Sequence, residues 1–257
     1  MDSMQQIITS FNPISLEEMS GIRLMNRIDT KFITTRPMLC QLLQMARQEY
    51  MIQEIDGERN MLYRTTYYDT TDYDMFYVHQ HGHANRQKMR FRSYVSSDLH
   101  FLEVKTKNNH GRTKKKRIAV SDMNIGEEQT DFLRRTLRYD AESLQPALEN
   151  SFRRITLVNR QRTERLTIDT ELHFHHLVSG LQREMDPLVI IELKRDGLSH
   201  SPILNMLRQL HIHPHGFSKY CMGSALTNPA LQVNLFKPKL HDVERLLKNR
   251  RIKKLEN

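Results

Sequence analysis

The chain has 257 residues, enough to bury a substantial core, and a formal net charge of +9 with 27% charged residues. This basic excess favours polyanionic partners, namely nucleic acid, an anionic membrane surface, or nucleotides and polyphosphates. Only Cys40 and Cys221 are present, which excludes a disulfide framework, and no apolar run reaches the length of a membrane span or a signal peptide. These features predict a cytoplasmic protein with no membrane span.

From residue 26 onward, charged and apolar residues alternate with period two, which is typical of strands with two different faces. The predicted strands lie at 26–34, 50–56, 61–70, 87–97, 100–109, 112–121, 151–161, 164–174 and 187–195. Apolar residues three or four apart predict helices over 36–49, 71–80, 127–138, 201–211 and 217–227. Together these elements predict an α+β fold in which a closed antiparallel β-barrel is covered on its outside by helices.

We expect one tunnel-like domain over residues 1–230, with its core at 22–228, followed by a basic helical tail over 231–257. In the tail, Leu240, Val243, Leu246 and Leu247 stand at helical spacing. Such a helix either docks on the barrel or binds an anionic partner, and we expect docking.

The charged faces of the predicted strands carry the functional signal. In KMRFRSY, Arg90 and Arg92 share one face, opposite Met89 and Phe91. The same alternation in later strands groups Glu103, Lys105, Lys107, Lys115, Arg117, Arg154, Arg160, Arg165, Asp169, Glu171, Glu192 and Lys194 on charged faces. A single strand of this kind normally turns its charges to water. Because helices are predicted to cover the apolar faces, we expect these repeated charged faces to point into the barrel.

Charges enclosed in this way are costly unless they have partners. Lys and Arg pair with phosphate oxygens, whereas carboxylates bind hard cations such as Mg²⁺ or Mn²⁺. Neither GxxxxGK[ST] nor GxGxxG occurs, so side chains must form the phosphate site. Trp is absent and the strand cations are not interleaved with aromatic residues, which argues against nucleic-acid binding.

Other candidate residues favour structural roles. Neither His79, His81 and His83 nor His211, His213 and His215 have a Cys or acidic partner at zinc-site spacing. Asp69 and Asp72 are expected to cap the helix that follows them. Tyr220 is compatible with either packing or ligand binding.

The ordered segments NRIDTKF, YYDT, KMRFRSY, FLEVKTK, KKKR, VNRQR, RLTIDTEL, IIELK and GFSKY resemble the VTC domain over about residues 22–228. This family is the polyphosphate polymerase branch of the triphosphate tunnel metalloenzymes. The resemblance implies an eight-stranded antiparallel tunnel that binds ATP and polyphosphate with Mn²⁺ or Mg²⁺. The regulatory SPX domain and the membrane helices of the eukaryotic subunits are missing from the sequence, so we expect a stand-alone prokaryotic form.

The resemblance also implies roles for individual residues. It places phosphate ligands at Lys31, Arg90, Arg92, Lys105, Lys115, Arg160 and Arg165, a metal-binding glutamate at Glu192, and tunnel-mouth residues at Ser218 and Lys219. The predicted catalytic group is Lys31, Arg90, Arg92, Lys105, Arg160 and Arg165. Lys115, Ser218 and Lys219 are predicted to bind the substrate. The strand pattern adds Lys107, Arg117, Arg154 and Lys194 as substrate-binding residues, and Glu103, Asp169 and Glu171 as metal ligands.

The resulting functional prediction is a polymerase that transfers the γ-phosphate of ATP to a polyphosphate chain. A terminal phosphate has a second pKa of about 6, so it attacks without a general base. One alternative is an inorganic triphosphatase, in which Glu103, Asp169 or Glu171 would activate water. Another is a non-catalytic polyphosphate-binding protein. Pyrophosphate or triphosphate as further ligands, and a membrane-protein partner, remain open.

Overall fold

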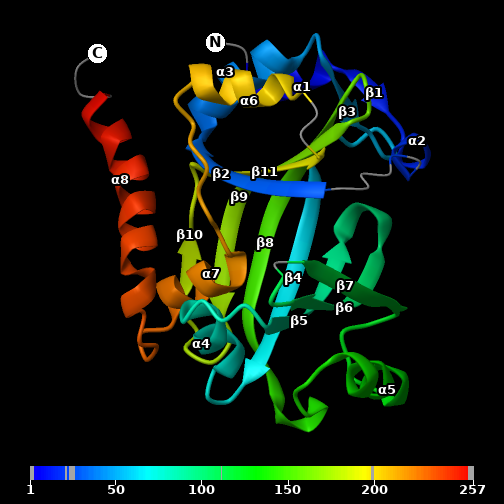
Figure 1. Ribbon diagram of the computed structural model, residues 1–257, viewed down its shortest axis with the longest axis vertical. Helices are drawn as coiled ribbons and strands as arrows, with labels where there is room; N and C mark the ends of the chain where they lie inside the picture. The colour runs from blue at the N-terminus through cyan, green and yellow to red at the C-terminus, as the bar shows by residue number, and fades with distance from the viewer. Residues whose placement is uncertain (1–2, 21, 23–26, 111, 198–199, 254–257) are drawn as a thin grey trace.

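The architecture is a single curved sheet with helices on both faces (Figure 1). A computed structural model describes residues 3–20, 22, 27–110, 112–197 and 200–253. The sheet has 11 strands, eight of which follow one another in the order β2-β11-β9-β8-β4-β5-β6-β7. All neighbours in this series that have an assigned register are antiparallel. The predicted α+β class with an antiparallel sheet is confirmed.

The strands are β1 (Asn12–Ile14), β2 (Arg27–Thr35), β3 (Tyr50–Gln53), β4 (Met61–Thr70), β5 (Arg86–Tyr94), β6 (Leu99–Lys107), β7 (Thr113–Val120), β8 (Leu144–Asn159), β9 (Glu164–His176), β10 (Gln182–Glu184) and β11 (Leu188–Asp196). The helices are α1 (Met4–Thr9), α2 (Leu16–Ser20), α3 (Arg36–Ala46), α4 (Asp74–Gln80), α5 (Glu127–Thr136), α6 (Pro202–Gln209), α7 (Lys219–Thr227) and α8 (Lys237–Lys253).

The prediction of a closed, eight-stranded barrel is wrong, because the sheet has 11 strands and ends at β2 and β7. On the outer side of β2, the loop before α7 pairs with the strand instead: Phe32 forms a bridge with Pro214, and the His215 N–H donates to the Lys31 carbonyl at 2.7 Å. Period-two alternation shows which side chains share a face of a sheet. It carries no information on whether the first and last strands pair.

The apolar faces of the strands pack against helices, as predicted. One cluster joins Ile191 and Leu193 of β11 and Leu166 of β9 to Leu39 and Leu43 of α3. A second cluster lies at the other end of the sheet and joins Met89, Phe91, Leu102 and Val104 to Phe132 and Leu133 of α5. These clusters leave the opposite, polar face of the same strands free of the outer helices.

Helix α7 lies on the polar side of the sheet. Its Tyr220, Cys221 and Met222 are buried in a cluster with Phe152 and Phe174 of β8 and β9. The approach is close at Gly223, where an added Cβ would lie 2.5 Å from Phe174 Cδ1 and 2.7 Å from Leu148 Cδ2. Only glycine allows this packing, which fixes the N-terminal end of α7 over the polar face.

Helix α8 docks on the rest of the molecule, as the tail pattern predicted. Val243 is 2% exposed, and Leu240, Leu246 and Leu247 pack beside it on the cluster below α7. In Figure 1 this helix runs along one side of the sheet.

Most predicted strands differ from the observed ones only at their ends, but β8 begins at Leu144 instead of residue 151. Pro146 concealed this part of the strand, since proline disfavours a central strand. It is accommodated where the register with β4 shifts between Tyr67 and Tyr68. Asn26 of the first predicted strand and residues 254–257 of the predicted tail lie outside the described residues. Within the described part of the chain, no helix is long and apolar enough to cross a membrane.

Candidate functional site

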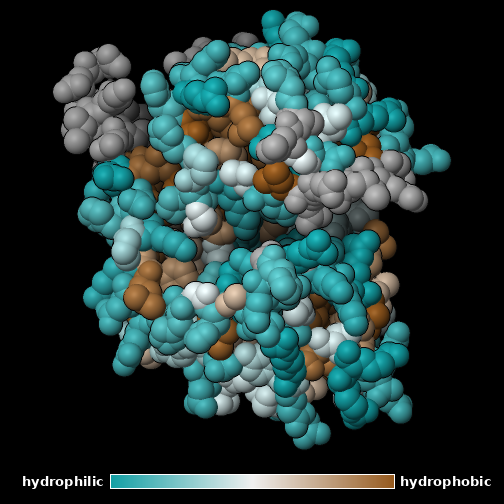
Figure 2. Space-filling model, in the orientation of Figure 1, coloured by the Kyte–Doolittle hydropathy of each residue, from teal (hydrophilic) through white to brown (hydrophobic). Residues whose placement is uncertain are grey.

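The polar face of the sheet brings together charged side chains from most of its strands. Cross-strand neighbours on this face include Lys31 and Glu192, Arg154 and Asp169, Arg90 and Glu103, and Lys105 with both Lys88 and Lys115. Directly opposed positions on one face lie about 5 Å apart, so these side chains form one continuous surface. Figure 2 shows this side of the molecule hollowed across its middle, with hydrophilic residues on both sides of the hollow.

The sheet curves enough for distant strands to face each other across this hollow. Lys105 of β6 and Glu192 of β11 are separated by four strands in the sheet order, yet each charge shifts the pKa of the other group. Lys31 of β2 and Lys88 of β5, which four strands also separate, reach adjacent residues: Lys31 Nζ donates to the Phe217 carbonyl at 3.0 Å and Lys88 Nζ to Ser218 Oγ at 2.7 Å. The sheet therefore forms an open channel, and the predicted convergence of cations on one interior face holds without a closed barrel.

Two buried carboxylates each bind two cations. Glu103 is fully buried, accepts from Arg90 Nε at 2.8 Å through one oxygen, and from Lys115 Nζ at 2.9 Å through the other. Although burial raises the pKa of Glu103, these cations and Arg92 hold it well below its usual range. Glu103 therefore stays ionised and orients Arg90 and Lys115.

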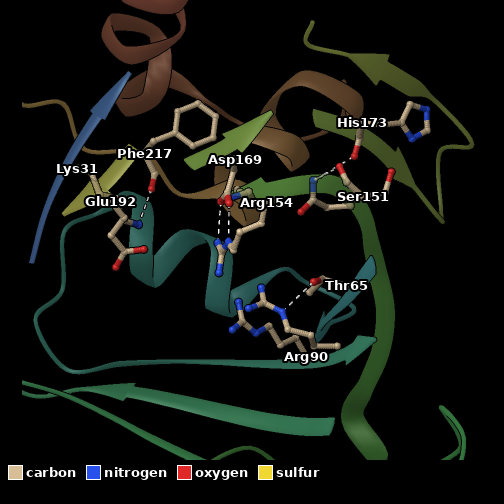
Figure 3. Close-up of polar contacts among 12 residues, drawn as sticks. Lys31, Thr65, Arg90, Ser151, Arg154, Asp169, His173, Glu192 and Phe217 are labelled. Carbon is tan, nitrogen blue, oxygen red and sulfur yellow. Dashed lines mark hydrogen bonds and ion pairs between the residues drawn. The ribbon is translucent and has the colours of Figure 1, made fainter. Parts of the chain in front are cut away.

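Asp169 has the same role as Glu103, and Figure 3 shows its contact with Arg154. It binds Arg154 through two hydrogen bonds of 2.6 and 2.8 Å and also pairs with Lys219 of α7. Arg154 and Lys219 hold the pKa of Asp169 well below its usual range despite burial. Burial lowers the pKa of Lys219 to about 8, and Asp169 limits this shift. The pair therefore ties the first residue of α7 to the sheet.

Two further cations have no carboxylate partner in the part of the chain that the structure describes. Arg92 is 7% exposed and donates from Nε to Thr65 Oγ1 at 3.3 Å, and its guanidinium lies near the rings of Tyr63 and Phe152. Burial and the neighbouring charges of Arg90 and Arg154 lower its pKa. The charge of Arg90, followed by burial, lowers the pKa of Lys105 well below its usual value. Among the described residues, neither cation has a carboxylate oxygen within 4.0 Å.

Glu192 is the least engaged of the predicted metal ligands on this face. Lys194 Nζ lies 3.5 Å away, which is longer than a hydrogen bond. Burial raises the pKa of Glu192, but Lys194, Lys31 and Lys105 lower it to about 2. Glu192 is therefore an ionised carboxylate surrounded by cations, with oxygen lone pairs still available.

The two tunnel-mouth residues lie where α7 begins. Ser218 caps the helix, since its Oγ accepts from the Cys221 N–H at 3.2 Å and from Lys88 Nζ at 2.7 Å. Lys31 reaches the same place and donates to the Phe217 carbonyl at 3.0 Å (Figure 3). Lys88 was not among the predicted site residues, although its position two residues before Arg90 places it on the same strand face.

Several predicted residues lie outside this group. Glu171 has a positive φ of 52° and pairs with Arg36 and Arg153 instead of facing the hollow. The cause is a register shift between β8 and β9, after which Leu172 takes the buried position that strict alternation assigned to Glu171. Arg160 is exposed beyond the end of β8 and donates to the Gln48 carbonyl at 2.8 Å.

The remaining predicted cations lie around the central group. Arg165 and Lys194 are half-buried neighbours on β9 and β11. Lys107 lies beside Arg86 near the end of β6, and Arg117 is exposed on β7 with its guanidinium 4.3 Å from the centre of the Phe101 ring. The face therefore grades from buried Arg90 and Arg92 and half-buried Arg154 at the centre to exposed Arg117 at the β7 edge.

Asp69 has the predicted capping role. Its two carboxylate oxygens accept from the N–H groups of Met75 and Phe76 at 2.9 Å each, at the start of α4. The hydroxyl of Tyr220 donates to the same carboxylate. Tyr220 is thus a buried packing residue that also joins α7 to α4.

The fold and site define an α+β protein with a channel lined by buried Arg and half-buried Lys side chains. The VTC domain matches residues 26–228, which is most of the chain, so the protein belongs to the VTC domain family. The family predicted from the ordered motifs is confirmed.

Solved structures show more distant similarity. A putative adenylate cyclase from Vibrio parahaemolyticus is 11% identical, covers 78% of this chain and 99% of its own, and has a TM-score of 0.47. A putative adenylyl cyclase from Hippeastrum, described as having dominant triphosphatase activity, is 16% identical and covers 81% and 99%, also with a TM-score of 0.47. No curated protein matches the sequence. The family assignment rests on the VTC match.

Proposed function

We propose that this protein is a polyphosphate polymerase, which transfers the γ-phosphate of ATP to the end of a polyphosphate chain held in the channel. The proposal combines the VTC family assignment with the charge of the polar face. Arg90, Arg92, Lys105 and Lys31 bind the triphosphate, and Arg154, Lys194 and Lys219 extend the cationic surface.

The observation that carries the proposal is that the buried Arg92 and the half-buried Lys105 have no carboxylate partner among the described residues. An uncompensated buried charge costs several kcal/mol or shifts its pKa, and the pKa of both groups is lowered. A structural role does not require this cost, since an apolar residue would pack there at least as well. A phosphate chain would supply the missing negative charge along the whole face.

The chemistry requires alignment and charge neutralisation more than covalent assistance. Transfer of a phosphoryl group proceeds in line between the attacking and leaving oxygens, and cations stabilise the charge on the transferred group. The chain end attacks with an already ionised phosphate oxygen, so no side chain has to remove a proton. Glu103 and Asp169 orient Arg90 and Arg154, which preorganises the donors.

A divalent metal fits this site through one protein ligand. No group of three His, Cys, Asp or Glu side chains suited to a metal forms within the described ranges, because Glu103, Asp169 and Glu171 are held in ion pairs. Glu192 has oxygens available, and Mg²⁺ commonly binds one carboxylate together with substrate phosphate oxygens. We therefore assign Glu192 alone as the protein ligand for Mn²⁺ or Mg²⁺. Such a metal, when bound, would neutralise charge on the phosphate oxygens.

The geometry supports phosphate transfer over hydrolysis. A hydrolase needs a general base whose pKa lies near the working pH. The pKa values of Glu103 and Asp169 lie far below that range, and Glu171 faces Arg36 and Arg153. None of the three suits the activation of water.

The test is to incubate the purified protein with ATP and Mn²⁺ and to separate the products by gel electrophoresis. Long polyphosphate is expected, whereas orthophosphate alone would indicate a triphosphatase. Arg92→Ala and Glu192→Ala should each abolish polyphosphate formation without unfolding the protein. Arg134→Ala is the control, because this arginine is exposed on α5 and, among the described residues, its side chain pairs only with Asp131 of the same helix.

A further inference from the structure

Apolar side chains continue the channel face beyond its cations, at the hairpin that joins β5 to β6. On β5, Tyr94 follows Arg90 and Arg92 at alternate positions. On β6, Phe101 lies directly opposite Arg92, and Leu99 lies directly opposite Tyr94. Directly opposed residues share a face of the sheet. Tyr94, Leu99 and Phe101 therefore lie on the same face as the cations that we assign to the triphosphate.

This apolar group is open to solvent, unlike the other face of the same strands. Leu99 is 49% exposed, and Tyr94 and Phe101 are half-buried. By contrast, Leu102 and Val104, on the opposite face of β6, are buried in the cluster that includes α5. Exposed apolar side chains that are grouped in this way and bordered by charges are typical of a ligand-binding surface.

Aromatic rings form a row across this part of the channel face. The Phe101 and Tyr94 rings lie 5.7 Å apart at 81° to each other, and the Tyr94 ring lies 4.9 Å from that of Tyr63. The guanidinium of Arg117 lies 4.3 Å from the centre of the Phe101 ring. On β7, the residue opposite Phe101 is the exposed Ala119, which adds little bulk beside the ring. Aromatic rings and guanidinium planes are the surfaces on which nucleobases stack.

The order of side chains along the two strands gives a bound nucleotide a direction. From the hairpin inward, the channel face presents the apolar group, then Arg92, then Arg90, and then Lys105, which faces the charge of Glu192. In a nucleoside triphosphate the base and the γ-phosphate lie at opposite ends. A base on the apolar group therefore places the α-phosphate nearest Arg92 and the γ-phosphate nearest Lys105 and Glu192.

We infer that Tyr94, Leu99, Phe101 and Arg117 form the binding site for the nucleobase of ATP. This inference rests on the proposed function, because it takes the channel cations as the triphosphate site. In-line transfer then brings the polyphosphate chain from the Lys105 end. The oxygen at the end of that chain bonds to the γ-phosphorus as the bond to the β-phosphate oxygen breaks, and ADP leaves at the hairpin end.

The test compares two ligands that share a triphosphate and differ in the nucleoside. Affinities of the full chain for ATP and for tripolyphosphate are measured by calorimetry with wild type, Phe101→Leu, Leu99→Ala and Leu181→Ala. Phe101→Leu keeps a large apolar side chain but removes the aromatic ring. Leu181→Ala is the matched control for Leu99→Ala, since Leu181 is 48% exposed and directly precedes β10.

Phe101→Leu is expected to weaken ATP binding about tenfold, as when other aromatic rings that stack on a base are removed, and to leave tripolyphosphate binding unchanged. Leu99→Ala should weaken ATP binding to a smaller extent, and Leu181→Ala should change neither affinity. Melting temperatures confirm that each variant folds.

Equal losses of ATP and tripolyphosphate binding in Phe101→Leu would mean that the ring only supports the neighbouring arginines, and would overturn the base site. Unchanged ATP binding in this variant would overturn it too, as would a wild type that binds tripolyphosphate but not ATP. A wild type that binds neither ligand would instead refute the proposed function, which is a separate outcome.

Discussion

The hydroxyl of Tyr220 donates a hydrogen bond to the carboxylate of Asp69, and this contact connects the cap of α4 to the first turn of α7. Tyr220 is 1% exposed, and its ring lies 5.2 Å from that of Tyr67. Because Ser218 and Lys219 directly precede Tyr220, its position determines where these two residues meet the channel.

Removal of this hydroxyl should loosen α7. We expect Tyr220→Phe to lower the free energy of unfolding by about 1–2 kcal/mol, because Asp69 loses one of its donors while keeping the N–H groups of α4. Tripolyphosphate affinity should also fall, since Lys219 is less well placed. Tyr68→Phe is the control, because no hydrogen bond from the Tyr68 hydroxyl is formed among the described residues. Urea unfolding and calorimetry measure the two effects, and equal behaviour of both variants would contradict the role of Tyr220.

Gly223 should be intolerant of any side chain. A methyl group there would contact Phe174 at 2.5 Å and Leu148 at 2.7 Å, so Gly223→Ala must move α7 away from the sheet. Such overpacking costs about 1–3 kcal/mol. In Gly216→Ala, by contrast, the added Cβ has no heavy atom within 4 Å and should cost much less. Denaturant midpoints of the two variants measure the difference, and similar midpoints would show that α7 packs loosely.

Arg92 should be expendable for stability and essential for binding. We expect Arg92→Met to keep or raise the melting temperature, because it removes a buried charge that lacks a carboxylate partner. Loss of charged hydrogen bonds to phosphate should weaken tripolyphosphate binding by about 1.5–3 kcal/mol, which is roughly tenfold to a hundredfold.

Glu103→Gln provides the contrast to Arg92→Met. Glu103 is fully buried and pairs with both Arg90 and Lys115, so its neutralisation should lower the melting temperature. If Arg92→Met proved as destabilising as Glu103→Gln, Arg92 would be a structural residue.

Phosphate binding should weaken as the pH rises above about 8, where Lys219 loses its proton. The stability of the free protein has the opposite sign. Burial depresses the pKa of Lys219 in the folded state, so the unfolded chain binds more protons between this pKa and the ordinary lysine value, and the contribution of Lys219 to stability rises with pH. Lys219→Arg should flatten the decline in binding but not abolish it, since the pKa of Lys105 is also lowered. Calorimetric titrations across this pH range test the prediction, and a decline in the variant as steep as in wild type would exclude Lys219.

Glu192→Gln should separate phosphate binding from metal binding. Removal of a negative charge among Lys194, Lys31 and Lys105 should strengthen metal-free binding of tripolyphosphate severalfold. Binding of Mn²⁺ to the protein–tripolyphosphate complex, followed by electron paramagnetic resonance, should be lost together with metal-stimulated activity. Unchanged Mn²⁺ binding would remove Glu192 as the ligand.

The sequence permitted a good prediction of which residues share the polar face, because alternation in KMRFRSY and IIELK translates directly into strand faces. It did not reveal the open sheet, since pairing of the outermost strands depends on the curvature of the whole sheet. Glu171 was misplaced because a bulge reverses the alternation after Asp169, and no residue type marks that bulge. Lys88 was missed because its importance comes from α7, which reaches it only in three dimensions.

The central claim is that a phosphate chain binds on the polar face among Arg90, Arg92, Lys105 and Arg154. A crystal structure of the protein with tripolyphosphate tests it most directly. Phosphate density is expected within hydrogen-bonding distance of Arg92 and Lys105, the two cations without a carboxylate partner among the described residues. Density confined to exposed lysines of β7 or α8, with Arg92 and Lys105 unchanged, would contradict it.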